Sequence, residues 1–117
     1  MTGILAALAG SGAVLPLAVV ASNVSRTRSG ATPDGFVETV ALPNTTITGG
    51  VAPYTQLWTK QSGDNPVCSD DTVLNPTWDA TVTDGDPNVS VWRVTVTDAM
   101  SSTASYDITV TLTWVQI

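Results

Sequence analysis

The amino-acid sequence predicts an all-β protein in which two sheets pack face to face as a sandwich. The first observation is a turn containing Gly49, Gly50 and Pro53, which leads into an extended segment ending at Trp58. The second is the alternation of apolar and polar side chains over residues 91–98, which is typical of a half-buried strand. The third is the composition, because only 12% of the residues are charged and threonine and serine supply much of the polarity. A sandwich needs large side chains to fill a gap of about 10 Å between its sheets, and Trp58 is placed to do so.

The first half of the chain contains signals for two or three strands. Residues 17–23 can form a first strand, and the composition of residues 29–35 predicts a loop. Alternation resumes over residues 36–42, and Pro43-Asn44 interrupts it before residues 45–48. Two arrangements fit this stretch: one long strand with a bulge, or two shorter strands at an edge, where proline is tolerated.

The second half predicts four more strands and a further short one. Residues 54–60 follow the glycine-proline turn, and residues 61–75 predict a long loop with a short strand around Val67. Alternation marks strands at residues 78–83, 89–98 and 106–114, separated by turn signals at residues 84–88 and 99–102. The last of these strands has an unbroken apolar face that ends at Trp114.

The predicted core is the set of apolar side chains that share one face of each strand. It comprises Phe36, Tyr54, Trp58, Trp78, Trp92, Val94, Ile108, Val110 and Leu112.

The first 25 residues form an apolar segment without a charged side chain. A secretory signal peptide fits poorly because no lysine or arginine precedes the apolar run, and a membrane span fits poorly because glycines and Pro16 interrupt it. We expect instead an assembly arm, extended or partly helical, that is buried against neighbouring subunits; Thr2 can cap a short helix over residues 4–8. The expected interface residues are Ile4, Leu5, Leu8, Val14, Leu15, Leu17, Arg26 and Arg28.

A length of 117 residues is enough for one domain. We expect residues 1–33 to be the arm and a linker, including the possible strand at 17–23, and residues 34–117 to be the sandwich. Arg26 and Arg28 lie at the junction, where they either grip an acidic patch on a neighbouring subunit or remain simply exposed.

The residue inventory argues against several functions. All ten acidic residues lie within residues 34–117 beside only Lys60 and Arg93, so we expect no nucleic-acid binding by the sandwich. The chain has no histidine and one cysteine, Cys68, which excludes an internal disulfide, histidine-based catalytic triads and the common zinc sites. We therefore expect no enzyme activity and no cofactor, and we interpret Cys68 as an unreactive thiol.

Three groups of residues have two interpretations. Asp84, Asp86 and Asp98 either meet at one end of the sandwich and bind calcium, or belong to turns; the turn is the better interpretation, because no complete calcium-loop spacing is present. Asp70-Asp71 has the same two interpretations, and no metal site is expected. Trp78 and Trp114 either form an aromatic platform for a sugar or lie in the core, which their alternation favours.

Seven or so short strands separated by turn signals describe an immunoglobulin-like sandwich. The motif Gly49-Gly50-x-x-Pro53-Tyr54-x-x-x-Trp58, followed by Trp92-Arg93-Val94-Thr95-Val96-Thr97-Asp98-Ala99 and a closing Thr-Val-Thr strand, resembles the PKD-like and bacterial Ig-like modules over residues 36–114. One departure is Ser62-Gly63-Asp64-Asn65, where PKD modules often have a Gly-Asp-Gly turn.

The opening Met-Thr-Gly-Ile-Leu-Ala-Ala-Leu is similar to that of small structural proteins of bacteriophage virions. This resemblance implies a non-enzymatic capsid-decoration or tail-associated protein, assembled in the bacterial host cytoplasm, whose partners are other virion proteins and further copies of itself, with no membrane involved. The alternative function is an adhesion module that binds host-surface carbohydrate or a receptor through loops such as residues 61–76.

Overall fold

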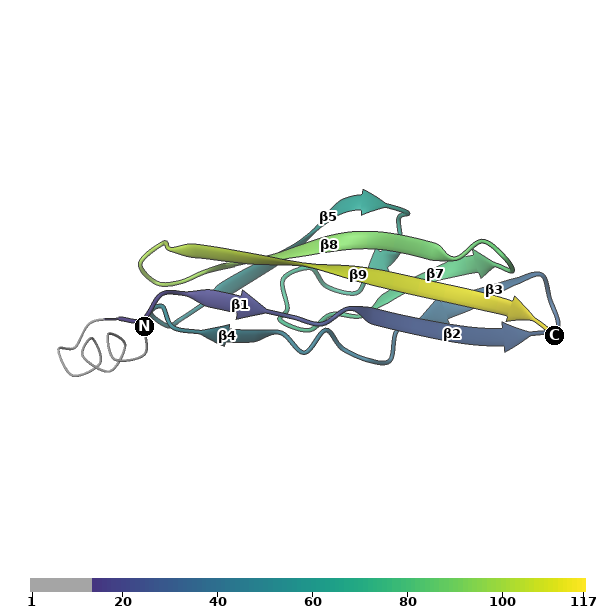
Figure 1. Cartoon of the computed structure of the whole chain (residues 1–117), viewed down its shortest axis with the longest axis horizontal. Coiled ribbons are helices and arrows are strands. Elements are labelled where there is room, and N and C mark those ends of the chain that lie inside the picture. The colour runs from purple at the N-terminus through teal and green to yellow at the C-terminus, as the bar shows by residue number, and fades with distance from the viewer. Residues whose placement is uncertain (1–13) are drawn as a thin grey trace.

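The computed structural model describes residues 14–117, which form an all-β fold of nine strands with no helix among them (Figure 1). The strands are β1 (Ala18–Val20), β2 (Val24–Gly30), β3 (Asp34–Glu38), β4 (Thr46–Thr48), β5 (Thr55–Gly63), β6 (Val67–Cys68), β7 (Trp78–Thr83), β8 (Asn88–Thr97) and β9 (Thr103–Gln116). The all-β prediction is confirmed. The predicted arm residues Ile4, Leu5 and Leu8, and the helix expected over residues 4–8, lie outside the described residues.

The largest sheet has four strands in the order β2-β9-β8-β5. β8 and β9 form a long antiparallel hairpin from Asn88↔Leu112 to Thr97↔Thr103, β5 pairs antiparallel with β8, and β2 runs parallel to β9. The alternation in β8 turns Ser90, Trp92, Val94 and Val96 inward, and the hydroxyl-rich face turns outward. On that outer face Arg93 and Asp107 form a two-pronged ion pair, with N···O distances of 2.8 and 3.1 Å.

Two smaller sheets oppose the four-stranded sheet and give a β-sandwich-like arrangement. One has the order β3-β7-β6, and the other pairs β1 with β4. Val37 and Val82 of the three-stranded sheet pack against Leu112 and Trp114 of β9, while a second cluster joins β1 to the middle of the large sheet. Residues 36–48 therefore contain two separate strands, which belong to different sheets.

Three tryptophans fill the centre of the sandwich. Trp58 and Trp78 meet edge to face with ring centroids 5.4 Å apart, and Trp92 lies 5.6 Å from Trp78. All three are buried, as are the predicted core residues Val94, Ile108, Val110 and Leu112, and Tyr54 is half-buried against them.

Phe36 was expected in the core, and this was wrong. The Phe36 side chain is 53% exposed, while the neighbouring Val37 is fully buried. The Trp114 ring lies over Gly35, where any Cβ would overlap it, so Gly35 faces inward. Because side chains alternate along a strand, Val37 and Thr39 then face inward too, and Phe36 must face solvent.

The loop expected over residues 29–35 is also shorter than predicted. β2 continues to Gly30 and β3 begins at Asp34, so only residues 31–33 connect them. Gly30 ends β2 without a side chain because the Trp114 ring occupies that space as well. Arg26 and Arg28 consequently lie within a strand of the sandwich rather than in a linker before it.

Candidate functional site

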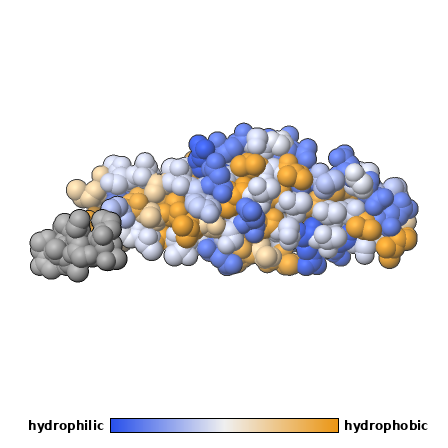
Figure 2. All heavy atoms as spheres, in the orientation of Figure 1, coloured by the Kyte–Doolittle hydropathy of each residue, from blue (hydrophilic) through white to orange (hydrophobic). Residues whose placement is uncertain are grey.

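The two ends of the sandwich differ sharply in charge. We call one end the N-terminal pole, made of residues 14–18, 48–54 and 98–102; Asp98 is its only charged residue. We call the other end the acidic pole, where Asp34, Asp64, Asp84 and Asp86 lie near the β2–β3 and β7–β8 connections. In Figure 2 the end where the described chain begins is mainly pale to orange, whereas deep blue lies over the middle of the visible face and, beside a group of orange atoms, at the far end.

Two glycines, Gly49 and Gly50, let the backbone of residues 15–17 pack closely against the N-terminal pole. The Gly50 N–H donates to the Leu15 carbonyl oxygen at 2.9 Å. Gly49 has φ +67°, and a Cβ at this position would overlap the Pro16 carbonyl oxygen. Only glycine combines this left-handed conformation with so close a backbone approach, so the Gly-Gly pair fixes where the preceding chain leaves the sandwich.

Tyr54 and Asp98 hold the glycine turn in place. The Tyr54 hydroxyl donates to the Gly49 carbonyl oxygen at 2.7 Å. Asp98 is buried and accepts backbone N–H bonds from Val51 at 3.0 Å, Met100 at 3.0 Å and Ser102 at 2.9 Å. One carboxylate thus ties the residue 49–51 turn to the β8–β9 hairpin.

The same contacts keep Asp98 ionised. Burial by itself raises the pKa of Asp98, but the N–H groups of Ser102, Val51 and Met100 together outweigh burial, so the pKa lies below its ordinary value. The carboxylate of Asp98 is thereby occupied by backbone hydrogen bonds, and the rest of the pole has no charged side chain.

A pocket of about 260 Å³ opens at this pole. Val14, Leu15, Pro16, Leu17, Gly50, Val51, Asp98, Met100 and Ser102 line it. Val14 is 55% exposed, Leu15 39% and Met100 72%, so large apolar side chains surround the pocket without covering it. Water-exposed apolar groups gathered at one place are typical of a surface that contacts another protein.

The predicted interface residues that the structure describes lie in two different places. Val14, Leu15 and Leu17 come together at the pocket, with Leu17 half-buried against the core. Arg26 and Arg28 do not join them, because they pair with Leu112 and Trp114 of β9 along the parallel β2–β9 ladder. Asp98 was considered for calcium, with a turn as the preferred interpretation, and Val51, Met100 and Ser102 were not predicted; the Gly49-Gly50 pair was the available signal for a close backbone contact there.

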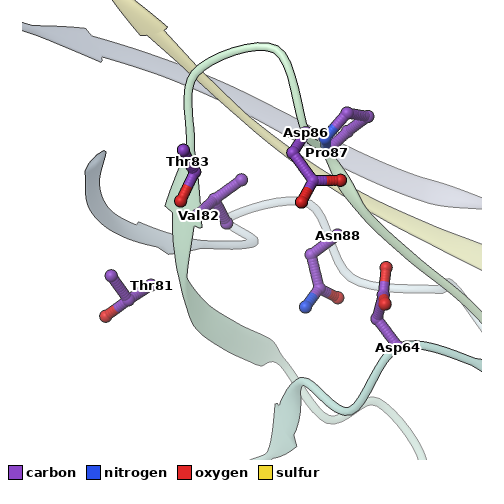
Figure 3. A pocket seen from close by; sticks show the side chains of 7 residues that line it. All are labelled: Asp64, Thr81, Val82, Thr83, Asp86, Pro87 and Asn88. Carbon is purple, nitrogen blue, oxygen red and sulfur yellow. The ribbon is translucent and has the colours of Figure 1, made fainter. Parts of the chain in front are cut away.

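The acidic pole has a smaller and more polar pocket of about 120 Å³ (Figure 3). The side chains of Asp64, Asp86 and Asn88 surround it, and Asp64 accepts the Val89 N–H at 3.0 Å. Asp84 accepts the Gln116 N–H at 3.1 Å. Asp64 and Asp84 thus each join a strand connection to a neighbouring strand, and within residues 14–117 no group of three or more His, Cys, Asp or Glu side chains could hold a metal ion.

The idea that Asp98 joins Asp84 and Asp86 is wrong. β8 separates them, since Asp86 and Asp98 lie beyond its opposite ends. Asp70 belongs to a turn, because its Oδ1 accepts both the N–H and the hydroxyl of Thr72, at 2.9 and 2.6 Å.

The other candidate residues take no part in an exposed site. Trp78 and Trp114 are buried, so they form no platform on the surface. Residues 70–74 of the expected binding loop turn back onto β5, where the backbone N–H of Trp58 donates to the Asp71 carbonyl oxygen at 2.8 Å. Burial, together with the negative charges of Asp71 and Asp70, outweighs a hydrogen bond from the Asp70 backbone and raises the pKa of Cys68 to about 11.

Residues 14–117 provide no helix with the length and apolar character needed to cross a membrane. Comparison with protein-family models, with curated proteins and with solved structures gave no match.

Proposed function

We propose that this protein is a non-enzymatic structural component of a bacteriophage particle, attached to neighbouring subunits at its N-terminal pole with the acidic pole projecting outward. The choice of a phage particle depends on the resemblance of the sequence to virion proteins. The assembly role depends on one observation: the chain leaves the sandwich from a pole with exposed apolar side chains and no charged side chain other than Asp98, which accepts three backbone bonds.

The proposed fold is an immunoglobulin-like module. The order β9-β8-β5 in one sheet, the opposing β3-β7-β6 sheet and the parallel addition of β2 to β9 support this assignment. In such modules the two ends of the sandwich are available for different tasks, here attachment at one end and display of carboxylates at the other.

Burial of the apolar pole supplies the energy for attachment. Each Å² of apolar surface removed from water contributes roughly 25 cal/mol, and Val14, Leu15 and Met100 are exposed at this pole; residues 1–13 contain no charged side chain either. The acidic pole has the opposite character and stays hydrated, since carboxylates are costly to bury without partners. This difference gives the module a defined orientation on a particle.

Deletion of residues 1–13 tests the proposal. The full chain and the deletion variant are produced during phage growth, each tagged after Ile117, which is 84% exposed and lies at the far end. We expect the full chain to sediment with particles and the deletion variant to stay in the supernatant, with the same far-ultraviolet circular dichroism.

Equal sedimentation of the two proteins would contradict the assembly role. If the deletion variant still bound host cells tightly, adhesion would be the better description. A variant with Ile117→Lys, which changes an exposed apolar residue away from the N-terminal pole, serves as the control and should sediment like the full chain.

A further inference from the structure

The pocket at the N-terminal pole has the size and the lining to bind aliphatic side chains. A cavity of 150 Å³ can already hold a benzene molecule, so about 260 Å³ has room for one or two branched side chains. Small-molecule sites usually start at roughly 300 Å³ and contain converging polar groups. Here the one charged group, Asp98, already accepts three backbone bonds.

We infer that this pocket receives the apolar segment 4–8 of a second copy of the chain, so that two adjacent copies, each with its N-terminal pole toward the particle, exchange arms. The inference rests on the proposed function and names the partner surface of the arm. Ile4, Leu5 and Leu8 lie in this segment, and the thirteen residues before Val14 contain no charged side chain. Such a segment matches a pole that also lacks free charge.

The position of Val14 makes the exchange reciprocal. Val14 lines the pocket, so the preceding residues leave from the wall of the pocket itself. An extended chain covers up to about 3.3–3.6 Å per residue, so thirteen residues reach roughly 45 Å, which is enough to cross to an adjacent copy. Because arm and pocket share one pole, each copy can fill the pocket of the other, and the assembly closes as a symmetric dimer rather than growing as a filament.

Disulfide trapping between two purified populations tests the exchange. Both carry Cys68→Ala, which removes the one native thiol. One population carries Leu8→Cys, and the other carries Met100→Cys and a fusion after Ile117 that changes its mass. Met100 lies at the pocket and is largely exposed, so its replacement should not affect folding.

On mild oxidation we expect a disulfide-linked heterodimer. The matched control replaces Met100→Cys with Ile117→Cys, which is also exposed but lies at the far end, and should give no heterodimer. In a separate measurement, Met100→Lys should weaken self-association of the full chain at least about tenfold, because a charge would have to be desolvated at the interface, while Ile117→Lys should leave it unchanged.

Two results would overturn the inference. If a single chain with both Leu8→Cys and Met100→Cys closes on itself at high dilution while mixed populations form no heterodimer, the arm fills the pocket of its own chain. If no disulfide forms and the purified full chain is monomeric at all concentrations, the pocket does not take a second copy. The sedimentation test remains independent, because an arm that binds a different virion subunit would still make particle attachment depend on residues 1–13.

Discussion

Replacing Gly49 with alanine should loosen the attachment of residues 15–17 to the sandwich. Gly49 has φ +67°, and holding an alanine in this left-handed region costs about 1–2 kcal/mol. The new Cβ also overlaps the Pro16 carbonyl oxygen, so residues 15 and 16 must move and the Gly50–Leu15 hydrogen bond of 2.9 Å breaks. A lost backbone bond costs about 0.5–1.5 kcal/mol, which gives a total of about 1.5–3.5 kcal/mol.

Gly85→Ala is the matched control. Gly85 has φ +77°, but no atom lies within 4 Å of the position of its added Cβ. Its substitution therefore has the conformational cost alone, about 1–2 kcal/mol. The difference between the two variants measures the displacement of residues 15 and 16.

Two assays together check this reasoning. Chemical denaturation gives the free energy of unfolding of both variants, and a domain with a typical 5–15 kcal/mol should remain folded in each case. Hydrogen exchange gives the protection of the Gly50 amide, which should fall in Gly49→Ala and stay unchanged in Gly85→Ala. Equal losses of stability with full Gly50 protection in both variants would show that the glycine contact does not hold the chain there.

Three further predictions concern stability and reactivity. The pKa of Asp98 is lower in the folded protein than its ordinary 3.8, so the stability that Asp98 adds is present above about pH 4 and is lost as the pH falls through the folded pKa. Urea titrations at several pH values should show that the free energy of unfolding falls less in acid for Asp98→Asn than for the unchanged protein. Trp78→Ala should cost about 3–5 kcal/mol by removing a buried ring that packs on two others, and Trp78→Phe should cost less in a thermal melt, since the Trp78 Nε1 has no hydrogen-bond partner to lose. Cys68, with a pKa raised to about 11 from 9.0, should react with a thiol reagent at pH 8 on the order of a hundredfold more slowly than free cysteine, and unfolding in urea should restore the ordinary rate.

Alternation of side chains determined most of the strands. Residues 78–83, 89–98 and 106–114 were predicted as strands, and the structure has β7, β8 and β9 there, with Trp92, Val94 and Val96 inward. In these segments the apolar positions recur every second residue and only one face can be buried, so local pattern and tertiary packing agree.

Phe36 marks the limit of this reasoning. The alternation of residues 36–42 defines two faces, but both contain apolar residues, and the pattern cannot say which face is inward. The choice depends on Trp114, which lies far away in the sequence and needs the space above Gly35. Such a contact is decided by packing between sheets and leaves no local signal.

The all-β character of the protein and the apolar first segment without charged side chains can be predicted from the amino-acid sequence, because both follow from local composition and spacing. The position of the pole without free charge depends on the folded chain. Three distant parts of the sequence meet there: residues 14–18, 48–54 and 98–102. β8 also separates Asp98 from Asp84 and Asp86. The physical reason is that a sheet brings distant strand ends together while it holds the two ends of each strand apart, and neither distance can be seen along the sequence.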